Sequence, residues 1–165
     1  MTFLQKLFKS RNIIDIVAPM NGRSVDITEV PDPTFSEKMI GDGVAIDPSD
    51  GTVVAPVTGE VVQVFPTGHA VGLRTPSGLE LLVHIGLETV GLKGEGFTLH
   101  VEKGAQVEVG APLLTFDLTL VRERAKAISP IVITNMERVL TLEKLPFGDV
   151  QVGRSPLMKV EISRN

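Results

Sequence analysis

Residues 67–86 read TGHAVGLRTPSGLELLVHIG, in which two Val/Leu-rich runs flank the turn sequence TPSG. Short apolar runs joined by a tight Pro/Gly turn are typical of an antiparallel β-hairpin. We therefore expect residues 70–75 to pair with residues 80–85. In such a ladder His69, at one end of the first strand, faces the far end of the second, where His84 lies. The sequence therefore predicts two imidazoles within a few ångströms of each other.

The rest of the chain repeats this pattern of short strands and turns. Its 165 residues suit a single domain with a real core, and its 16 glycines and 11 prolines fall between short Val/Ile/Leu-rich runs. We expect an all-β fold, an antiparallel β-sandwich or flattened barrel. Its strands are expected at residues 13–17, 23–26, 43–47, 52–54, 59–65, 70–75, 80–85, 106–107, 112–118, 131–134, 139–142 and 158–162. Short helical segments are expected only at residues 3–10, 34–39 and 120–126.

One internal repeat indicates a duplicated hairpin unit. The sequence APMNG at residues 18–22 recurs as APVTG at residues 55–59, each time between two strand-like runs. In both copies Pro fixes φ and Gly permits a positive φ, so the motif specifies a turn into the next strand. Two similar turns that arose by chance are the alternative.

The composition excludes several classes of function. The formal net charge is -4, which disfavours binding to nucleic-acid phosphates, and the lack of Trp and Tyr removes the aromatic platforms that stack on bases. With no Cys, disulfides, thiolate metal sites and cysteine nucleophiles are excluded. No apolar stretch approaches the ~20 residues of a spanning helix, and the N-terminus lacks the pattern of a signal peptide. We therefore expect an intracellular, soluble protein.

The first eleven residues differ in charge from the rest. They carry three basic side chains and no acid, so a chain charge of -4 leaves -7 for residues 12–165. On a helical wheel their Phe and Leu side chains share one side, and Lys6 and Lys9 lie opposite, which is typical of a helix on an anionic membrane surface. A helix docked on its own domain is the alternative. We therefore divide the chain into a basic amphipathic tail at residues 1–11 and one globular domain at residues 12–165.

The paired histidines are the strongest candidates for chemistry. Two close imidazoles can bind a metal, share general acid–base work, or act as nucleophile and stabiliser. Gly86 could bring a backbone carbonyl to Nδ1 of His84 and leave Nε2 unprotonated, and the Thr67 hydroxyl could orient His69. A structural, partly buried histidine is the alternative for each. His100 has no partner in the sequence and is expected to be structural or on the surface.

Two other chemistries are open at this point. The segments EKGAQV at 102–107 and VGAPL at 109–113 resemble biotinyl and lipoyl carrier domains, and Met158-Lys159 imitates the biotin attachment motif. However, Lys159 lies inside an expected strand rather than at the tip of a hairpin. A metallopeptidase of related β architecture would need a His-x-His sequence, which this chain lacks.

Short motifs with a specific order and spacing run through almost the whole chain. They are Ala18-Pro19-x-x-Gly22, Pro31-Asp32-x-x-Phe35-x-Glu37-Lys38, Gly41-Asp42-Gly43, Ala55-Pro56-Val57-x-Gly59, Thr67-x-His69-Ala70, Val83-His84-Ile85-Gly86-Leu87-Glu88-Thr89-Val90, Lys93-Gly94-Glu95-Gly96-Phe97 and Thr134-Asn135. In this respect the sequence resembles the glucose-class enzyme IIA of the bacterial phosphoenolpyruvate-dependent sugar phosphotransferase system, from about residue 13 to residue 162.

The resemblance implies a β-sandwich phosphocarrier, a component of a phosphotransferase. His84 would accept a phosphoryl group on a ring nitrogen from the histidine-containing phosphocarrier protein and pass it to a cysteine of enzyme IIB, in the service of the IIB/IIC sugar permease. By the same matching, His69 is the second active-site histidine, which bonds the phosphoryl oxygens, and Thr67 supports the site. No cofactor is required, although some members bind zinc at a partner interface through both histidines. We expect a cytoplasmic monomer whose tail contacts the inner face of the membrane.

The resemblance also implies a docking surface around the histidines. An apolar patch with an acidic rim would recruit basic-rimmed partners briefly. Its expected members are Asp32, Phe35, Met39, Ile40, Phe65, Leu82, Glu88 and Val90. Because some members of the family regulate permeases or a kinase, the alternative function is a noncatalytic regulator that binds partners through the same surface. No nucleic-acid partner is expected.

Overall fold

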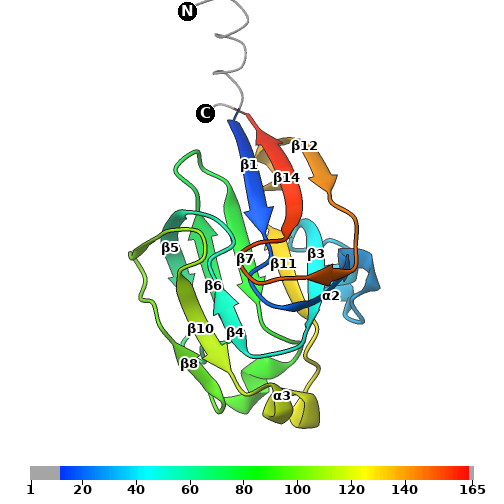
Figure 1. The fold of residues 1–165 in the computed structure, drawn as a ribbon, viewed down its shortest axis with the longest axis vertical. Coiled ribbons are helices and arrows are strands. Elements are labelled where there is room, and N and C mark those ends of the chain that lie inside the picture. The colour runs from blue at the N-terminus through cyan, green and yellow to red at the C-terminus, as the bar shows by residue number, and fades with distance from the viewer. Residues whose placement is uncertain (1–11, 164–165) are drawn as a thin grey trace, which may run out of the picture.

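The computed structural model describes residues 12–163, and Figure 1 shows that they form layers of strands with only short helices. The strands are β1 (Asn12–Val17), β2 (Gly22–Asp26), β3 (Asp42–Pro48), β4 (Thr52–Val54), β5 (Gly59–Val64), β6 (Ala70–Arg74), β7 (Glu80–His84), β8 (Phe97–Leu99), β9 (Gln106–Val107), β10 (Pro112–Phe116), β11 (Ser129–Ile133), β12 (Val139–Lys144), β13 (Asp149–Val150) and β14 (Pro156–Ile162). The helical segments are η1 (Ile27–Glu29), α2 (Pro33–Ser36), η2 (Thr89–Leu92), α3 (Leu118–Arg124) and η3 (Met136–Arg138). The prediction of an all-β fold with short helical segments is confirmed.

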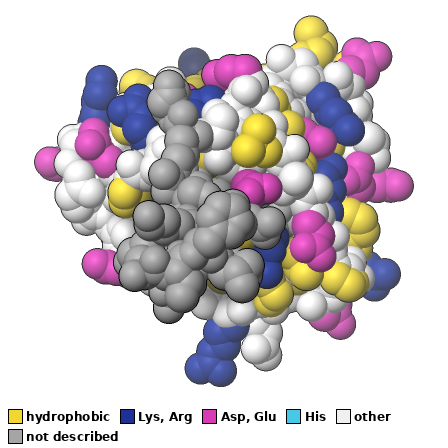
Figure 2. Space-filling model, turned by 90° about the horizontal axis from the view of Figure 1, so that it is seen from above, with side chains coloured by type: hydrophobic (Ala, Val, Ile, Leu, Met, Phe, Trp, Pro, Cys, Tyr) yellow, Lys and Arg dark blue, Asp and Glu magenta, His cyan; other side chains and the backbone are white. Residues whose placement is uncertain are grey.

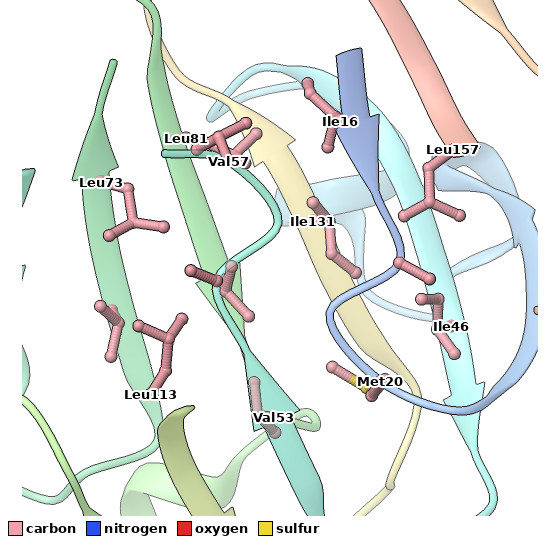
Figure 3. Close-up of a cluster of buried hydrophobic side chains, with 14 of the residues drawn as sticks. Ile16, Met20, Ile46, Val53, Val57, Leu73, Leu81, Leu113, Ile131 and Leu157 are labelled. Carbon is pink, nitrogen blue, oxygen red and sulfur yellow. The ribbon is translucent and has the colours of Figure 1, made fainter. Parts of the chain in front are cut away.

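The strands of residues 12–163 pair antiparallel and build three sheets. The large sheet has eight strands in the order β13-β2-β3-β11-β7-β6-β5-β9, and the small sheets are β1-β14-β12 and β4-β10-β8. Leu73, Leu81 and Ile131 from the large sheet face Ile16 and Val53 from the small sheets in one core (Figure 3). Each of these side chains is fully buried, which stabilises the fold by about 1.5–3 kcal/mol relative to exposure. The fold is therefore an antiparallel sandwich, as predicted.

The strand order has an approximate two-fold symmetry about the boundary between β7 and β11. In the large sheet β13, β2, β3 and β11 correspond to β9, β5, β6 and β7, and the two small sheets correspond to each other. Strands β4 to β10 therefore repeat the unit made by β1 to β3 and β11 to β14, and this second copy is inserted between β3 and β11.

Hydrogen bonds between the two copies of the repeated motif support this symmetry. Val17 N–H donates to the Pro56 carbonyl (3.1 Å), and Val54 N–H donates to the Pro19 carbonyl (2.8 Å). Both the donors and the acceptors are separated by 37 residues, the same shift that separates the two sequence motifs. The predicted duplication is confirmed, and the alternative of two chance turns is rejected.

The prediction of a positive φ is confirmed for Gly22, whose φ is 156°, but not for Gly59. Both glycines share a second constraint. A Cβ at Gly59 would lie 2.3 Å from the Arg74 carbonyl oxygen, and a Cβ at Gly22 would lie 2.1 Å from the Asp47 carbonyl oxygen. Glycine is needed in both copies because the backbone of the neighbouring strand approaches too closely for any side chain.

Every strand expected from the sequence is present, with ends that differ by at most two residues. Strands β8 and β13, which are short and lie at sheet edges, were not predicted, although the equally short edge strands β4 and β9 were. The expected helix at 34–39 is shorter, since Lys38 adopts a positive φ of 58°. The expected helix at 120–126 begins two residues earlier, because the Asp117 carboxylate caps Leu120 N–H (3.1 Å).

Two further expectations concern the membrane. The expected tail at residues 1–11, with its helix at 3–10, lies outside the described residues. Within residues 12–163 no helix has the length and apolar character needed to cross a bilayer.

Candidate functional site

The hairpin of β6 and β7 brings the two histidines together. Ala70 pairs with His84, and the ladder continues one step further through a hydrogen bond from Ile85 N–H to the His69 carbonyl (2.7 Å). The ring centroids of His69 and His84 lie 5.0 Å apart, and their planes meet at 80°. The predicted strand pairing and the predicted closeness of the two imidazoles are confirmed.

The turn between these strands sets their register. Gly78, with φ of 101°, donates its N–H to the Thr75 carbonyl (2.9 Å), and the Thr75 hydroxyl accepts from Leu79 N–H (3.0 Å). A slip of one residue would turn His84 into the core and its buried neighbour Val83 out of it. The turn therefore decides that His84 points to the outer face of the large sheet.

The site lies at the end of the sheet near α3. Leu87 and Lys126, which is two residues beyond the end of α3, exchange backbone hydrogen bonds of 2.9 and 3.5 Å. Figure 1 shows α3 at the opposite end of the molecule from the start of β1 and the end of β14. Figure 2, which looks from above onto the end opposite α3, shows acidic and basic side chains mixed on the part of the surface that is coloured. The residues that follow His84 therefore lie at the α3 end of the sheet.

His84 is held by the backbone of the residue two positions further on. Its Nδ1 lies 2.8 Å from the Gly86 carbonyl oxygen. A carbonyl oxygen only accepts hydrogen bonds, so Nδ1 carries the proton and Nε2 keeps a free lone pair. Gly86 has a φ of 70°, and a Cβ there would lie 2.5 Å from the Lys126 carbonyl oxygen. The turn that directs this carbonyl at His84 therefore requires glycine.

His69 is oriented by a side chain instead. The Thr67 hydroxyl oxygen lies 2.5 Å from Nδ1 of His69, whose side chain is almost fully buried. Within residues 12–163, Nε2 of neither His69 nor His84 has a hydrogen-bond partner. Neither Nε2 is among the buried polar atoms that lack a partner in this part of the chain, so solvent reaches both atoms.

Two phenylalanines flank the imidazole pair. The Phe35 ring centroid lies 5.2 Å from that of His84, and the Phe65 centroid lies 5.2 Å from that of His69 in an edge-to-face arrangement. Asp32 caps α2 by accepting from Thr34 N–H (3.0 Å), which places Phe35 in the first turn of that helix. Phe35 is only 5% exposed, so it packs against His84 and offers little surface to a partner.

Burial makes both imidazoles poor bases. It lowers the pKa of His84 to about 4, and the neighbouring His69 acts in the same direction. The hydrogen bond to Gly86 and the charge of Asp32 raise the pKa of His84, but they do not outweigh burial. Burial also lowers the pKa of His69. Both rings are therefore neutral at neutral pH, and Nε2 of His84 needs no base to become a nucleophile.

Comparison with known proteins decides the family. The profile of the family described as phosphoenolpyruvate-dependent sugar phosphotransferase system, EIIA 1, matches residues 14–139. The chain belongs to this family. This EIIA chain is 56% identical over 148 residues to the PTS system glucose-specific EIIA component of Halalkalibacterium halodurans, with 89% of this chain and 86% of that protein covered. The protein of the same name from Bacillus anthracis is 50% identical over 146 residues, with 88% of each chain covered.

A solved structure agrees. The glucose permease IIA from Mycoplasma capricolum superimposes on this EIIA chain with a TM-score of 0.85 and 38% sequence identity, covering 96% of this chain and 99% of that one. The resemblance stated from the motifs is therefore confirmed at the level of both family and fold.

The other residues expected at the docking surface of this EIIA chain differ in exposure. Glu88, Met39 and Val90 are exposed, the last two to 71% and 59%, whereas the remaining members are partly buried: Asp32, Ile40, Phe65 and Leu82. Met39 and Ile40 line a hollow together with Thr134 and Met136, near the far end of β11. The expected members therefore differ in how much surface they offer to a partner, and Met39 and Ile40 lie by the hollow at the end of β11.

Several other candidate residues lie outside the histidine site. Among the described residues, no group of three or more His, Asp or Glu side chains is close enough to hold a metal ion, so His69 and His84 alone would supply two nitrogen ligands. His100 is exposed, with Nε2 3.3 Å from the Thr115 hydroxyl, as expected. Lys159 lies in mid-strand in β14, between β1 and β12, and not at a hairpin tip, so a biotinyl or lipoyl attachment site is not formed.

Sequence reasoning missed two hydroxyls beneath the site. Ser129 and Thr89 are buried; Ser129 accepts from Gly86 N–H, and Thr89 donates to the Ile85 carbonyl. Thr89 belongs to a motif of the family resemblance, but nothing in the sequence shows where its hydroxyl points. Ser129 lies 43 residues beyond Gly86, and only the pairing of β7 with β11 brings the two together.

Proposed function

We propose that this EIIA chain is a phosphocarrier that accepts a phosphoryl group on Nε2 of His84. The observation that carries this proposal is the hydrogen bond between Nδ1 of His84 and the Gly86 carbonyl (2.8 Å), which leaves Nε2 unprotonated beside a second neutral imidazole. The lowered pKa of His84, about 4, keeps the lone pair available at neutral pH.

Two successive displacements at phosphorus make up the proposed reaction. The lone pair of His84 Nε2 forms a bond to phosphorus, while the bond from phosphorus to the histidine nitrogen of the donor, the histidine-containing phosphocarrier protein, breaks. The His84 ring then carries a positive charge, which the Gly86 carbonyl stabilises through the Nδ1 proton. In the second step a cysteine thiolate of enzyme IIB bonds to phosphorus, and the electron pair of the P–N bond returns to Nε2.

His69 and Thr67 stabilise the transferred group in this proposal. If the Thr67 hydroxyl donates to Nδ1 of His69, the proton of His69 resides on Nε2, the nitrogen that has no partner in residues 12–163. That N–H can bond a phosphoryl oxygen while the group is on His84 and during its transfer. Phosphoryl transfer depends mainly on such positioning and charge stabilisation, and it needs no cofactor here.

We further propose that partners bind around the histidines. The exposed Met39 and Val90 and the acidic Asp32 and Glu88 supply apolar contacts and negative charge on the outer face, and the -7 charge of residues 12–165 favours basic-rimmed partners. The partners are the phosphocarrier donor and the IIB/IIC permease. The chain would act as a cytoplasmic monomer, with residues 1–11 as a separate basic tail that contacts the membrane.

Zinc and regulation are secondary to this proposal. A zinc ion held by His69 and His84 would take its other ligands from a partner, because residues 12–163 form no site with three or more such ligands. Regulation of permeases or kinases through the same surface would not require a reactive His84.

The test is intact mass after incubation with phosphoenolpyruvate and the two general phosphotransferase proteins. We expect one acid-labile phosphoryl group on the wild type and on His100→Ala, and none on His84→Ala. His69→Ala is expected to be loaded but to lose transfer to enzyme IIB in a rapid-mixing assay. No gain of mass in the wild type would reject the phosphocarrier and leave a noncatalytic regulator. Unchanged onward transfer in His69→Ala would reject the role of His69.

A further inference from the structure

Two peptide planes meet at Gly86, and each is held by two hydrogen bonds. In the plane between Ile85 and Gly86, the Ile85 carbonyl accepts from the Thr89 hydroxyl (2.5 Å), and Gly86 N–H donates to the Ser129 hydroxyl oxygen (3.0 Å). In the next plane, the Gly86 carbonyl accepts from His84, and the N–H of the following residue donates to the Lys126 carbonyl (2.9 Å). Four bonds thus fix the direction of the carbonyl that holds the His84 proton.

The two hydroxyls in this set have no access to water. Ser129 is 0% exposed and Thr89 is 1% exposed. Ser129 also donates to the Ala127 carbonyl (2.7 Å), so its oxygen can only accept from Gly86. The donor and acceptor of each hydrogen bond are therefore defined. His84 Nδ1–H donates to the Gly86 carbonyl, Gly86 N–H donates to the Ser129 hydroxyl oxygen, and the Ser129 hydroxyl donates to the Ala127 carbonyl.

We propose that Ser129 and Thr89 are positioning residues that select the Nδ1-protonated tautomer of His84. Neither hydroxyl contacts the reacting nitrogen. Each holds the Ile85–Gly86 peptide, and this peptide directs the adjoining Gly86 carbonyl at Nδ1. The proposal deepens the phosphocarrier function and rests on it for its consequence in phosphoryl transfer.

Loss of either hydroxyl leaves a backbone group of this peptide without its partner. In Ser129→Ala the buried Gly86 N–H has no acceptor, and the peptide gains by turning towards another one. The Gly86 carbonyl then no longer favours a proton on Nδ1 over a proton on Nε2. Molecules with the proton on Nε2 lack the lone pair that attacks phosphorus, so the rate of loading falls.

Ser24 is a matched control in the same sheet. It is 2% exposed, accepts from Gly148 N–H (3.1 Å) and donates to the Gly148 carbonyl (3.3 Å). Ser24→Ala therefore removes an equally buried serine hydroxyl that bonds a glycine backbone, at a distance from His84 along the sheet order. Thr89→Val and Thr89→Ser form a second pair, because valine keeps the shape of threonine and serine keeps its hydroxyl.

The first readout is the tautomer of His84 in the unphosphorylated full chain, from long-range proton–nitrogen correlation spectra. We expect wild type, Ser24→Ala and Thr89→Ser to show an unprotonated Nε2, and Ser129→Ala and Thr89→Val to show averaged shifts for the two nitrogens. The second readout is the rate of phosphoryl loading, which we expect to fall about tenfold only in the latter two variants.

Several outcomes would overturn this inference. Wild-type nitrogen shifts in Ser129→Ala and Thr89→Val, together with a loss of stability like that of Ser24→Ala, would reduce both hydroxyls to a structural role. If Ser129→Ala fails to fold, the Thr89 pair decides the question alone, and wild-type shifts in Thr89→Val overturn it. Because the tautomer is read without phosphate, a wild-type chain that cannot be loaded would reject the phosphocarrier function separately.

Discussion

The two ends of the β7–β11 pair are equivalent in the symmetry of the fold but differ in chemistry. The symmetry relates each residue of β7 to the residue of β11 that is 49 positions later in the sequence. Gly86, after the end of β7, therefore matches Asn135, after the end of β11. Glu80, at the start of β7, matches Ser129, at the start of β11. At one end Gly86 N–H bonds the Ser129 side chain (3.0 Å). At the other end Glu80 N–H bonds the Asn135 side chain (2.8 Å). The same pair of matching positions is thus joined at both ends, but the residue that follows the strand uses its backbone at the first end and its side chain at the second.

This exchange determines which end is free to react. Asn135 uses both polar atoms of its side chain, because Nδ2 also donates to the Gly78 carbonyl (2.8 Å), and it thereby closes the hairpin turn. Gly86 has no side chain, so its carbonyl accepts from the His84 ring, and the second nitrogen of that ring is left without a partner in residues 12–163. The reactive end is therefore the one at which hydrogen bonding is incomplete.

The two ends also differ in whether they carry charged side chains. Ala70, which pairs with His84, corresponds to Asp42, which pairs with Ile133. Lys144 bonds both Asp42 (2.7 Å) and Asp26 (2.6 Å). Burial raises the pKa of Asp26, but hydrogen bonds from Lys144 and Thr28 outweigh it and lower the pKa to about 2. Charges are thus neutralised by pairing at the structural end, whereas the reactive end holds two neutral rings.

Gly86→Ala should break the reactive end with the largest effect. Alanine there must adopt a φ of 70°, and its Cβ would lie 2.5 Å from the Lys126 carbonyl oxygen and 2.6 Å from Thr89 Cγ2. We expect a loss of stability of about 3 kcal/mol or more and a fall in phosphoryl loading of about a hundredfold. Urea denaturation and the rate of mass gain measure the two effects.

Gly91→Ala provides the stability control for this variant. A Cβ at Gly91 meets no atom within 4 Å, and its φ is not positive. We expect its stability to stay within about 0.5 kcal/mol of the wild type. A Gly86→Ala protein with wild-type stability and loading would show that the turn does not depend on glycine, and it would remove the basis for the comparison of the two ends.

Acid should destabilise the protein through the reactive end. The pKa of His84 is about 4 in the folded state, against 6.5 as its ordinary value. Between pH 4 and pH 6.5 His84 is therefore protonated in the unfolded chain but not in the folded chain. Stability therefore falls as pH decreases from 6.5 to 4, and this contribution is constant below 4. Allowing for the partial exposure of His84, the total loss is on the order of 2 kcal/mol.

The measurement is the free energy of unfolding by urea at several pH values between 4 and 7. His84→Gln should lose less stability over this range than the wild type, and His100→Gln, changed at an exposed histidine, should follow the wild type. Because burial also lowers the pKa of His69, part of the pH dependence should remain in His84→Gln. Parallel curves for wild type and His84→Gln would contradict the lowered pKa of His84.

Local patterns in the sequence were sufficient to predict most of the fold. Alternating apolar runs, the TPSG turn and the repeated AP-x-x-G motif depend on nearby residues, and the strands, the hairpin and the duplication follow from them. The edge strands β8 and β13 were missed, and since the equally short β4 and β9 were predicted, shortness alone does not account for this. The close approach of a neighbouring strand to Gly22 and Gly59 was also missed, since it depends on the backbone of residues distant in sequence.

The site was predictable only where its contacts are close in sequence. Thr67 with His69, and His84 with Gly86, are separated by two residues, and one hairpin joins both pairs. The support from Ser129 comes from across the β7–β11 pairing, which is not a hairpin and leaves no local signal. Burial, which lowers the pKa of both histidines, is likewise a property of the packed structure.

Asn135→Ala should break the structural end and spare the reactive one. Alanine removes the acceptor of Glu80 N–H and the donor to the Gly78 carbonyl, so we expect a loss of about 2 kcal/mol in the free energy of unfolding by urea. Because the register of β6 and β7 rests on several further backbone bonds, loading of His84 should stay within about twofold of the wild type. Gly86→Ala should lose both properties, so the two variants together separate what each end contributes. A fall in loading for Asn135→Ala as large as that for Gly86→Ala would mean that the hairpin transmits changes along its whole length, and that the two ends of the β7–β11 pair are not independent.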